Sequence, residues 1–403
     1  MSELGEKKIA WARAHMPVME HIASELESSL DGMTVGMALH VEAKTAVLVE
    51  TLAGAGARVA ITGCNPLSTQ DEVASALRDE GIECYARRGH SPEEYYGAIH
   101  KVLDAEPDIL VDDGADLMFM LHTERTELLP RIRGGCEETT TGVIRLRAMH
   151  AQGELKIPVM AVNNARTKFL FDNRYGTGQS AWDGIIRTTN LLVAGKRVVV
   201  AGYGWCGKGV AMRADGLGAH VIVCEVDTVR ALEAHMDGYE VLPMNEAARV
   251  GDIFITTTGD RDVIRVEHMK LMKDRVVLAN AGHFNVEIDL AGLEDVARSK
   301  REVRENIAEY VLDGKRIYVL AEGRLVNLAA GDGHPVEVMD MSFANQALCV
   351  HHLAHTALAP GVYEVPEHID THVAQLKLSS LGVSIDELTE VQKRYLSEWR
   401  QGT

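Results

Sequence analysis

The pattern Gly202-Tyr-Gly204-Trp-Cys-Gly207 could hold a pyrophosphate, because glycines at this spacing let backbone N–H groups approach phosphate oxygens closely. The pattern directly follows the apolar run VVVA and opens a predicted helix, whose N-terminus attracts negative charge. The next predicted strand ends at Glu225, whose carboxylate can accept hydrogen bonds from a ribose 2′-hydroxyl and would repel a 2′-phosphate. These features predict an NAD site rather than an NADP site, but a simple dehydrogenase would show them equally well.

A second group of polar side chains follows the predicted strands of the N-terminal half. His40 follows the first strand, Asn65 follows the second, and Asp112, Asp113 and Asp116 follow the fourth. The carboxyl ends of parallel strands meet at one edge of a sheet, and ligands bind at that edge. We therefore expect these side chains to converge there.

Alternating apolar runs and amphipathic stretches supply the elements that must position both groups. One series begins near Thr34 and ends with DILVDDG, and another begins near Ser180 and ends with RIYVLAEG. This alternation predicts an α/β fold class with two doubly wound parallel-sheet (Rossmann-like) domains plus a short helical C-terminal tail. We expect a discontinuous substrate-binding domain over residues 1–180 and 335–372, an NAD-binding Rossmann domain over 181–334, and a tail over 373–403.

The composition argues against several other classes of protein. The net charge of -18 argues against a nucleic-acid partner, and no apolar run reaches the roughly 18 residues of a membrane-spanning helix. Six scattered cysteines without a C-x-x-C pair predict neither disulfides nor a zinc site, and together with an N-terminus that lacks an apolar signal segment they predict a cytoplasmic protein. The segment HHLAH at 351–355 has the spacing of metal ligands on a helix but no acidic companion, so we expect a structural role and no metal site.

Seven segments in matching order resemble the S-adenosylhomocysteine hydrolase family, and the similarity runs from about Trp11 into the C-terminal tail. The segments are STQDEVA at 68–74, DDGAD at 112–116, EETTTGV at 137–143, KFLFDNRYG at 168–176, VVVAGYGWCGKG at 198–209, GHFNVEID at 282–289 and AEGRLVNLAAGDGHP at 321–335. The resemblance implies reversible hydrolysis of S-adenosyl-L-homocysteine to adenosine and L-homocysteine. It also implies a small nucleoside thioether as substrate and a homotetramer as the assembly.

The chemistry of that family explains why a hydrolase needs NAD. Oxidation of the 3′-hydroxyl to a ketone makes the C4′ hydrogen acidic, so a base can remove it and homocysteine can leave by elimination. Water then adds, and the ketone is reduced again by the cofactor that stayed bound.

The resemblance further implies catalytic roles for individual residues. Lys168 and Asp172 match the pair that binds and deprotonates the 3′-hydroxyl, and a cationic nicotinamide nearby could lower the pKa of Lys168. His40 and Asp113 match a pair near C4′ and O5′, and His283 matches a histidine that closes over the 5′ side. With a ribose-binding carboxylate and an orienting amide added, the expected catalytic residues are His40, Asp113, Glu138, Asn163, Lys168, Asp172 and His283.

Binding residues are implied in the same way, and they come from both predicted domains. The expected cofactor-binding residues are Thr139, Thr140, Thr141, Asn173, Gly202, Gly204, Gly207, Glu225, Asn280 and Asn327. The expected substrate-binding residues are Glu42, Lys44, Thr45, Asp332, His334 and Met339. Taken singly, each polar residue could be a helix cap, a turn or a solvated side chain, and it is the ordered set that favours the functional interpretation.

Glu42 and Lys44 depart from the commonest family pattern, His-x-Thr-x-Glu, at positions that face the purine. A carboxylate only accepts hydrogen bonds and an ammonium only donates them. Lys44 at a 6-oxo group with Glu42 at N1–H suits hypoxanthine, whereas Glu42 at a 6-amino group with Lys44 at N1 suits adenine. S-inosyl-L-homocysteine, the substrate of some archaeal members, is therefore the alternative substrate, and Asp332 in place of an apolar purine-wall residue leaves the same question open.

Two further departures bear on the cofactor. Thr177 stands where many members have a cysteine near the nicotinamide, and the tail ends WRQGT without the Lys and Tyr that reach the NAD of a neighbouring protomer in many relatives. From Thr177 we expect no thiol-based tuning of the cofactor, and from the tail we expect weaker retention of the cofactor than in those relatives.

Two other functions fit an NAD site: a dehydrogenase with net NAD turnover, and a catalytically silent NAD-binding regulatory paralogue. The silent paralogue is disfavoured because a binding module would not need Lys168, Asp172, His40, Asp113 and His283.

Overall fold

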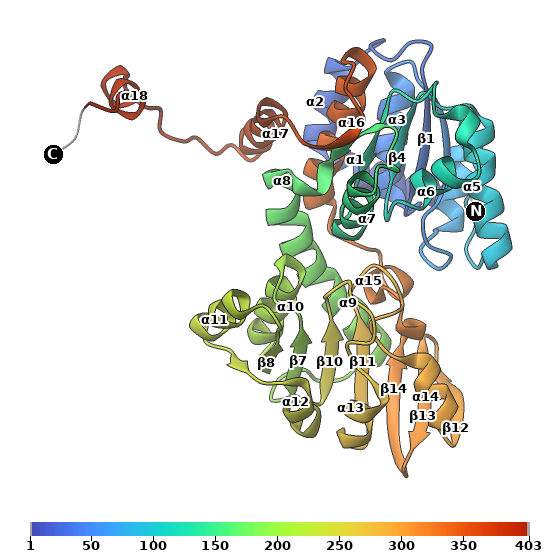
Figure 1. Cartoon of the computed structure of the whole chain (residues 1–403), viewed down its shortest axis with the longest axis vertical. Helices are drawn as coiled ribbons and strands as arrows, with labels where there is room; N and C mark the ends of the chain where they lie inside the picture. The colour runs from blue at the N-terminus through green and yellow to red at the C-terminus, as the bar shows by residue number, and fades with distance from the viewer. Residues whose placement is uncertain (1, 401–403) are drawn as a thin grey trace.

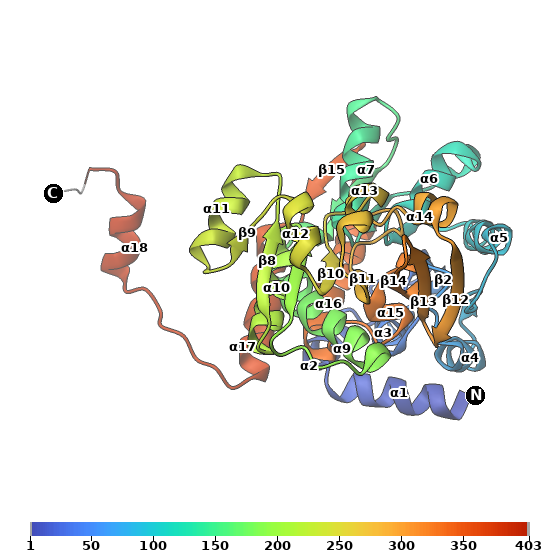
Figure 2. The ribbon, with the colours of Figure 1, turned by 90° about the horizontal axis from the view of Figure 1, so that it is seen from below.

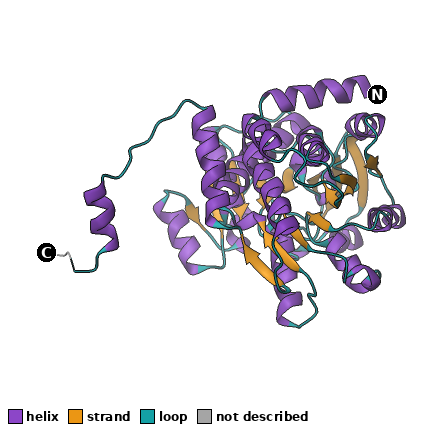
Figure 3. Cartoon of the chain, turned by 90° about the horizontal axis from the view of Figure 1, so that it is seen from above, coloured by secondary structure: helices purple, strands orange, loops and turns teal. Residues whose placement is uncertain are grey.

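A computed structural model describes residues 2–400 and separates the chain into two α/β lobes (Figure 1). The two lobes are connected twice, because the chain leaves the first lobe before α9 (Thr177–Thr189) and returns to it at α16 (Val336–His355). Each lobe is a sheet with helices on its faces, as the colouring by secondary structure shows (Figure 3). The predicted fold class is confirmed.

The first lobe contains a seven-stranded sheet in which every strand pairing is parallel. Its order is β15-β6-β5-β4-β1-β2-β3, so the order reverses on the two sides of β1. The strands are β1 (Thr34–Leu39), β2 (Arg58–Gly63), β3 (Glu83–Cys84), β4 (Ile109–Asp112), β5 (Gly134–Glu137), β6 (Pro158–Ala161) and β15 (Gly361–Glu364). A parallel sheet opens a crevice where its strand order reverses, and here β1 and β4 end beside that crevice.

The helices that cover this sheet come from both ends of the chain. They are α1 (Ser2–Ala14), α2 (Pro17–Glu25), α3 (Ala43–Gly54), α4 (Asp71–Asp79), α5 (Pro92–Asp104), α6 (Asp116–Thr123), η1 (Thr126–Leu128), α7 (Thr140–Ala151), η2 (Val162–Asn164), α16 and α17 (Glu367–Ser380).

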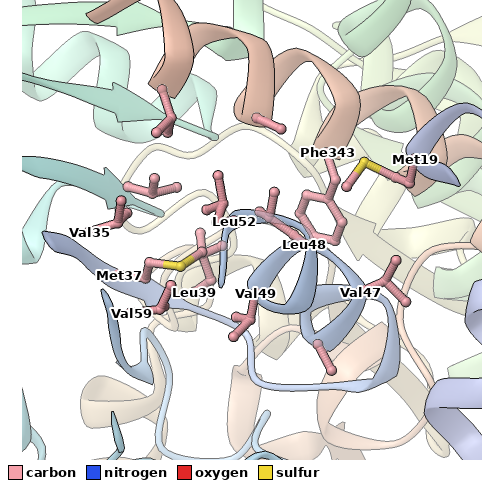
Figure 4. Packing of buried hydrophobic residues seen from close by; sticks show 14 of the residues in the cluster. Met19, Val35, Met37, Leu39, Val47, Leu48, Val49, Leu52, Val59 and Phe343 are labelled. Atoms are coloured by element: carbon pink, nitrogen blue, oxygen red, sulfur yellow. The ribbon is translucent and has the colours of Figure 1, made fainter. Parts of the chain in front are cut away.

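One core of this lobe lies between β1, α3 and α16 (Figure 4). Val35, Met37 and Leu39 alternate along β1 and are at most 1% exposed. They share a core with Leu48 of α3 and Phe343 of α16. Because α16 lies near the end of the sequence, the C-terminal part of the chain completes the first domain.

The second lobe contains an eight-stranded sheet in the order β12-β13-β14-β11-β10-β7-β8-β9. The strands are β7 (Arg197–Ala201), β8 (His220–Cys224), β9 (Glu240–Val241), β10 (Ile253–Thr256), β11 (Val276–Asn280), β12 (Ser299–Arg304), β13 (Ile307–Leu312) and β14 (Lys315–Leu320). Strands β12 and β13 pair antiparallel, which the predicted parallel sheet did not include. The polar edge strand β12, SKREVR, is exposed at every position, so it lacks the apolar signal that marks a strand.

The helices of the second lobe and its connections complete the fold. They are α8 (Arg166–Lys168), the π-helical η3 (Phe169–Gly176), α9, α10 (Trp205–Gly216), α11 (Thr228–Met236), α12 (Met244–Val250), α13 (Val266–Leu271), α14 (Leu290–Val296), η4 (Ala321–Gly323) and α15 (Val326–Ala329). We keep the division into domains at residues 180, 334 and 372 as a proposal. Helix α9 runs through the first boundary and α17 through the last, where Val373 is buried in the core of the first lobe.

Beyond α17 the chain extends away from both lobes and carries α18 (Glu390–Ser397) at its far end, as two perpendicular views show (Figures 1 and 2). Helix α18 has no buried residue. Across residues 2–400, no helix combines the length and the apolar character that a membrane span needs.

Candidate active site

A cavity of about 1100 Å³ lies between the two lobes, and residues that follow β1, β4 and β5 face residues that follow β7, β8 and β11 across it. A site for one drug-sized ligand is usually about 300–1,000 Å³, so this cavity has room for a cofactor and a substrate together. All but three of the residues predicted to be catalytic, substrate-binding or cofactor-binding line it. The exceptions are Gly207, Asn280 and Asp332. Asn65, Asp112 and Asp116, which were expected at the same sheet edge, do not line it.

Lys168 is the centre of one polar group in the cavity, and only 4% of it is exposed. Its Nζ donates to Asn173 Oδ1 at 2.8 Å and to Asn163 Oδ1 at 3.4 Å, and it lies 3.0 Å from Asp172 Oδ2. An ammonium has three N–H groups, and because Asn163 Oδ1 also accepts from Asn173 at 3.0 Å, the N–H at the long 3.4 Å contact can turn to a ligand oxygen. Asn163 was expected to orient a catalytic group and Asn173 to bind the cofactor, and here both amides contact Lys168.

The π-helical stretch η3 explains how neighbouring residues reach Lys168. A π turn closes on the fifth residue along the chain, and such turns recur at functional sites. Asp172 and Asn173, four and five residues after Lys168, therefore both lie on its side.

Glu138 directly follows β5 and offers this group an unused acceptor. Its Oε2 accepts a hydrogen bond from Gln346 of α16, while Oε1 lies 3.5 Å from Lys168 Nζ and is buried without a hydrogen-bond partner among the described residues. Burial raises the pKa of Glu138 to about 7, although the charge of Lys168 opposes the shift. A buried, unpaired carboxylate oxygen is costly, so its position indicates a ligand hydroxyl.

Lys168 and Asp172 each stabilise the ionised form of the other. Burial alone would lower the pKa of Lys168, but the carboxylates of Asp172 and Glu138 outweigh burial and raise that pKa above its usual range. Burial would raise the pKa of Asp172, but Lys168 and the hydrogen-bonded His334 lower it. The expected lowering of the Lys168 pKa by a cationic nicotinamide stays a prediction, and the protein's own charges act in the opposite direction.

His40, Asp113 and His283 form a second group, in which the carboxylate lies between the two rings. His40 Nε2 is 3.6 Å from Asp113 Oδ2, and His283 Nδ1 is 3.4 Å from Asp113 Oδ1. On the far side of its ring, His40 Nδ1 lies 2.7 Å from Ser68 Oγ, and that hydroxyl donates to the Asn65 carbonyl at 3.1 Å. His40 Nδ1 has a hydroxyl and a thiol within reach, so the ring can carry its proton on either nitrogen.

Burial shifts the pKa values of all three residues of this second group. It lowers the pKa of His40 to about 4, lowers the pKa of His283, and raises the pKa of Asp113. Neutral imidazoles beside a carboxyl group of raised pKa can exchange one proton among themselves. The potential ligand atoms of the three residues also lie within 4.8 Å of one another, close enough for a divalent metal. We interpret the group as an acid–base group because proton transfer is what elimination and addition require.

The low pKa of His40 predicts a measurable dependence of stability on pH. Between pH 6.5 and about pH 4 the unfolded chain protonates His40 while the folded chain does not, so stability falls as the pH is lowered. We expect the wild type to lose about 2 kcal/mol relative to His40→Asn between pH 7 and pH 5, measured by urea unfolding. Between pH 7.5 and pH 8.5 the difference between the two chains should stay constant. A parallel pH dependence from pH 7 to pH 5 would contradict the shifted pKa.

Glu42 and Lys44 also line the cavity and are both buried. The Glu42 carboxylate caps α3 by accepting from the backbone N–H groups of Lys44 at 3.0 Å and Thr45 at 3.3 Å. Lys44 Nζ lies 2.6 Å from Glu42 Oε2 and donates to the Asp332 carbonyl at 2.9 Å. Two partners leave the ammonium one N–H for a ligand.

The structure corrects the interpretation of Asp332 as a purine-wall residue. Its side chain is 65% exposed and lies 3.5 Å from Arg187 of α9, outside the cavity. Only its carbonyl oxygen points toward Lys44. Thr45, His334 and Met339, by contrast, line the cavity, and their substrate-binding roles stay predictions.

The glycine-rich turn fits the predicted cofactor. Gly202 has a φ of +99°, which favours glycine, and a Cβ on Gly207 would collide with the Gly202 carbonyl oxygen. Gly207 therefore serves the close packing of the turn rather than lining the cavity. Glu225 lines it, and backbone N–H groups, among them that of Tyr203 at 2.7 Å, hold its carboxylate in place.

Side chains from both lobes surround this turn. Thr139, Thr140 and Thr141 of the first lobe line the same cavity, and Asn327 has a buried Oδ1 without a hydrogen-bond partner in residues 2–400. Asn280 differs from the prediction. It lies outside the cavity, because its amide already donates to the carbonyls of Gly282, Phe284 and Gly323 and so holds the loop that carries His283.

Several residues of the site were not predicted. Ser342 donates to Asp172 Oδ2 at 3.2 Å and Gln346 donates to Glu138, both from α16, and Cys64 Sγ lies 3.2 Å from His40 Nδ1. A signal for the first two was present, since Ser342, Asn345 and Gln346 form a polar stripe at helical spacing in an otherwise apolar segment.

Comparison with known proteins agrees with the geometry. A family model for S-adenosyl-L-homocysteine hydrolase matches residues 1–129, and a model for the NAD binding domain of that family matches residues 173–333. The chain is 67% identical over 404 residues to S-inosyl-L-homocysteine hydrolase of Methanosarcina acetivorans, with 100% of this chain and 98% of the relative covered. It is 64% identical over 403 residues to adenosylhomocysteinase of Archaeoglobus fulgidus, with 99% and 100% covered.

Among solved structures, a dipicolinate synthase chain from Bacillus halodurans is similar in fold, with a TM-score of 0.50 and 15% identity over 81% of this chain and 99% of that one. At this identity the likeness supports the fold alone.

Proposed function

Because the chain belongs to the S-adenosyl-L-homocysteine hydrolase family, we propose that it hydrolyses S-adenosyl-L-homocysteine reversibly to adenosine and L-homocysteine. The observation that carries the proposal is that one cavity holds two separate acid–base groups, one around Lys168 and one around Asp113. A dehydrogenase needs only one group at the carbon it oxidises. A hydrolase that works through a ketone needs a second group for elimination and addition.

The Lys168 group acts on the ribose hydroxyls. The ammonium of Lys168 holds the 3′-oxygen, and Asp172, kept ionised by Lys168 and His334, accepts its proton. The free Oε1 of Glu138 accepts a hydrogen bond from the neighbouring hydroxyl. When bound, NAD supplies the hydride acceptor for C3′ and returns the hydride at the end of the cycle.

The Asp113 group acts at C4′ and C5′. Asp113 and the neutral His40 take the C4′ proton, Asp113 passes a proton to His283, and His283 delivers it to the departing sulfur. Addition of water runs the same transfers in reverse, with the proton returned to C4′. Two histidines on one carboxylate let the group finish each cycle in the protonation state in which it began.

S-inosyl-L-homocysteine is the second candidate substrate, and the names of relatives favour it. Both carboxylate oxygens of Glu42 already accept hydrogen bonds, from the N-terminus of α3 and from Lys44, so Lys44 offers a purine one N–H. An N–H donor suits the 6-oxo group of hypoxanthine and also N1 of adenine. Several relatives carry the name S-inosyl-L-homocysteine hydrolase, among them those of Methanosarcina acetivorans and Methanocaldococcus jannaschii.

Replacement of Lys44 by methionine tests how the base is bound. We expect Lys44→Met to lower kcat/KM for the inosyl thioether by roughly 10- to 100-fold, as for loss of a hydrogen bond from a charged group, and to change the adenosyl thioether far less. Lys7→Met removes an exposed lysine from α1 and is the matched control. Glu42 is a poorer target because its loss also uncaps α3. Equal losses with both thioethers would contradict a role in reading the 6-position.

Release of free thiol tests the proposed reaction itself. The protein with NAD should liberate homocysteine from the adenosyl or the inosyl thioether without accumulating NADH in bulk. Bulk NADH would instead indicate a dehydrogenase. Absence of thiol with both thioethers would refute the hydrolase and leave the silent regulatory paralogue.

A homotetramer and a cytoplasmic location are further parts of the proposal. The arm after α17 exposes Val391, Leu396 and Trp399, each more than 70% accessible, and such an apolar arm suits contact with another copy of the chain. The six cysteines are free thiols, which suits a reducing compartment. Light scattering of the full chain tests the tetramer, which a monomeric mass would exclude.

A further inference from the structure

Arg145 of α7 is a cation on the cavity wall that the reaction described above does not use. Its Nη1 donates to the carbonyl of Gly114 and to Asp116 Oδ1, the latter at 2.7 Å. The guanidinium also lies 5.8 Å from the ring centroid of Phe119 and 5.9 Å from that of Phe284. Two aromatic rings and two oxygen acceptors therefore hold the group in a defined orientation.

The guanidinium keeps donors available. Within residues 2–400, neither Nε nor Nη2 of Arg145 makes a hydrogen bond, and the side chain is 32% exposed. A guanidinium carries five N–H donors in a planar fork that matches a carboxylate. The unused donors therefore suit a carboxylate ligand.

Arg145 lies beside the group that acts at C4′ and C5′. The Gly114 whose carbonyl it binds follows Asp113 directly, and the His283 ring packs against Gly114 so closely that a Cβ there would strike its Nε2. Phe284, which contacts Arg145, packs edge-on against His283 with ring centroids 4.5 Å apart. Whatever is attached to C5′ through sulfur must extend past this group, and Arg145 borders it.

The other cationic side chains that line the cavity are either paired with nearby carboxylates or belong to the second lobe. Lys44 is engaged by Glu42 at the purine end, and Lys168 is enclosed by the ribose group. Arg230, Arg261 and Arg265 belong to the second lobe, in segments that follow β8 and β10. Three lysines and arginines of the first lobe line the cavity within residues 2–400, and Arg145 is the one without a role so far.

We propose that Arg145 binds the α-carboxylate of the homocysteine part of the substrate and so selects thiols that carry a carboxylate. This inference rests on the proposed function, because it takes the leaving group to be homocysteine. Homocysteine carries a carboxylate at neutral pH, and the free edge of a fixed guanidinium recognises it at little cost in side-chain order.

The test runs the reaction in the direction of synthesis, from a nucleoside and a thiol. Two thiols are compared, L-homocysteine and 3-mercaptopropylamine, which lacks the carboxylate. The wild type should prefer L-homocysteine in kcat/KM by at least about tenfold. We expect Arg145→Met to lower kcat/KM for L-homocysteine by roughly 10- to 100-fold, to change the value for 3-mercaptopropylamine by less than about threefold, and so to remove the preference.

Controls separate recognition from a structural effect on the Asp113 loop. Arg147→Met removes an exposed arginine two residues along the same helix, which pairs with Glu364, and should leave both thiols unaffected. Arg145→Lys keeps the charge without the fork and should restore part of the preference for L-homocysteine. Cofactor reduction by nucleoside alone, followed at 340 nm, needs no thiol and should be unchanged in both Arg145 variants.

Two results would overturn the inference: equal losses with both thiols in Arg145→Met, or a preference for L-homocysteine that survives in that variant. If Arg145→Met does not fold, Arg145→Lys decides, because an undiminished preference there would overturn binding by the guanidinium fork. Failure of the proposed function would look different, since the wild type would then form no thioether from either thiol.

Discussion

A chain with methionine in place of Lys168 is expected to oxidise the 3′-hydroxyl of its nucleoside roughly 10²–10⁴ times more slowly than the natural chain. The ammonium is the group in the ribose site that can hold the 3′-oxygen while Asp172 takes its proton, and its close contacts with Asn173 and Asp172 orient it. Methionine has a similar length but offers no donor. The measurement is the single-turnover rise in absorbance at 340 nm after a nucleoside is mixed with the NAD-loaded protein.

The same substitution affects stability, and this effect must be separated from catalysis. Without Lys168, the carboxylates of Asp172 and Glu138 remain buried without their cation, a loss that typically costs about 3–5 kcal/mol. Lys168→Gln keeps a donor for Asp172 and should fold more stably while remaining slow. Lys7→Met, at an exposed ion pair, should behave as the wild type in both measurements. An unchanged single-turnover rate in folded Lys168→Met would exclude the proposed role.

The fold could be predicted where burial leaves a pattern in the sequence. The central strands of both sheets are buried along most of their length, so their apolar runs were visible, and the glycines around residue 202 marked the turn between β7 and α10. The hairpin of β12 and β13 was missed because β12 is polar and exposed along its whole length. Such a strand is held by backbone pairing with its neighbour, which leaves little mark on residue types.

The sequence predicted which residues belong to the site. It did not predict how their side chains are oriented. Asp332 is placed beside the purine end by its carbonyl, whereas its carboxylate turns to Arg187, and no sequence pattern distinguishes these two arrangements. The pKa of Lys168 depends on the sum of opposing effects, burial against two carboxylates, which only distances can resolve. Residue types thus indicated which residues form the site, whereas packing determines the orientation and the charge state of each side chain.

The two acid–base groups allow the halves of the reaction to be separated by mutation. Lys168 and Asp172 are expected to serve oxidation, and Asp113 with its two histidines is expected to serve proton transfer at C4′. A variant of the Asp113 group should therefore leave oxidation in place, whereas a variant of the Lys168 group should stop both steps, because proton removal follows oxidation. This expectation distinguishes two working groups from one extended network in which every substitution would stop the first step.

Asp113→Asn is the variant that tests this separation. The amide has nearly the same shape but cannot accept and return a proton, so we expect exchange of the 4′-hydrogen with deuterium from solvent to slow by roughly 10²–10⁴-fold. Cofactor reduction by the nucleoside should stay within about threefold of the wild type, since Lys168 and Asp172 are untouched. Exchange is followed by NMR of the nucleoside in deuterium oxide, and reduction at 340 nm.

Lys168→Met provides the reverse comparison. Lys168→Met should lose exchange as well as reduction, because the C4′ hydrogen becomes acidic only after C3′ is oxidised, whereas Asp113→Asn should lose exchange alone. Asp116→Asn is a less suitable control, since Asp116 binds Arg145 and Tyr95. Asp108→Asn, just before β4 and away from the cavity, is the better one, and it should retain both activities. If Asp113→Asn exchanges the 4′-hydrogen at the natural rate, then His40 or His283 removes the proton without the carboxylate.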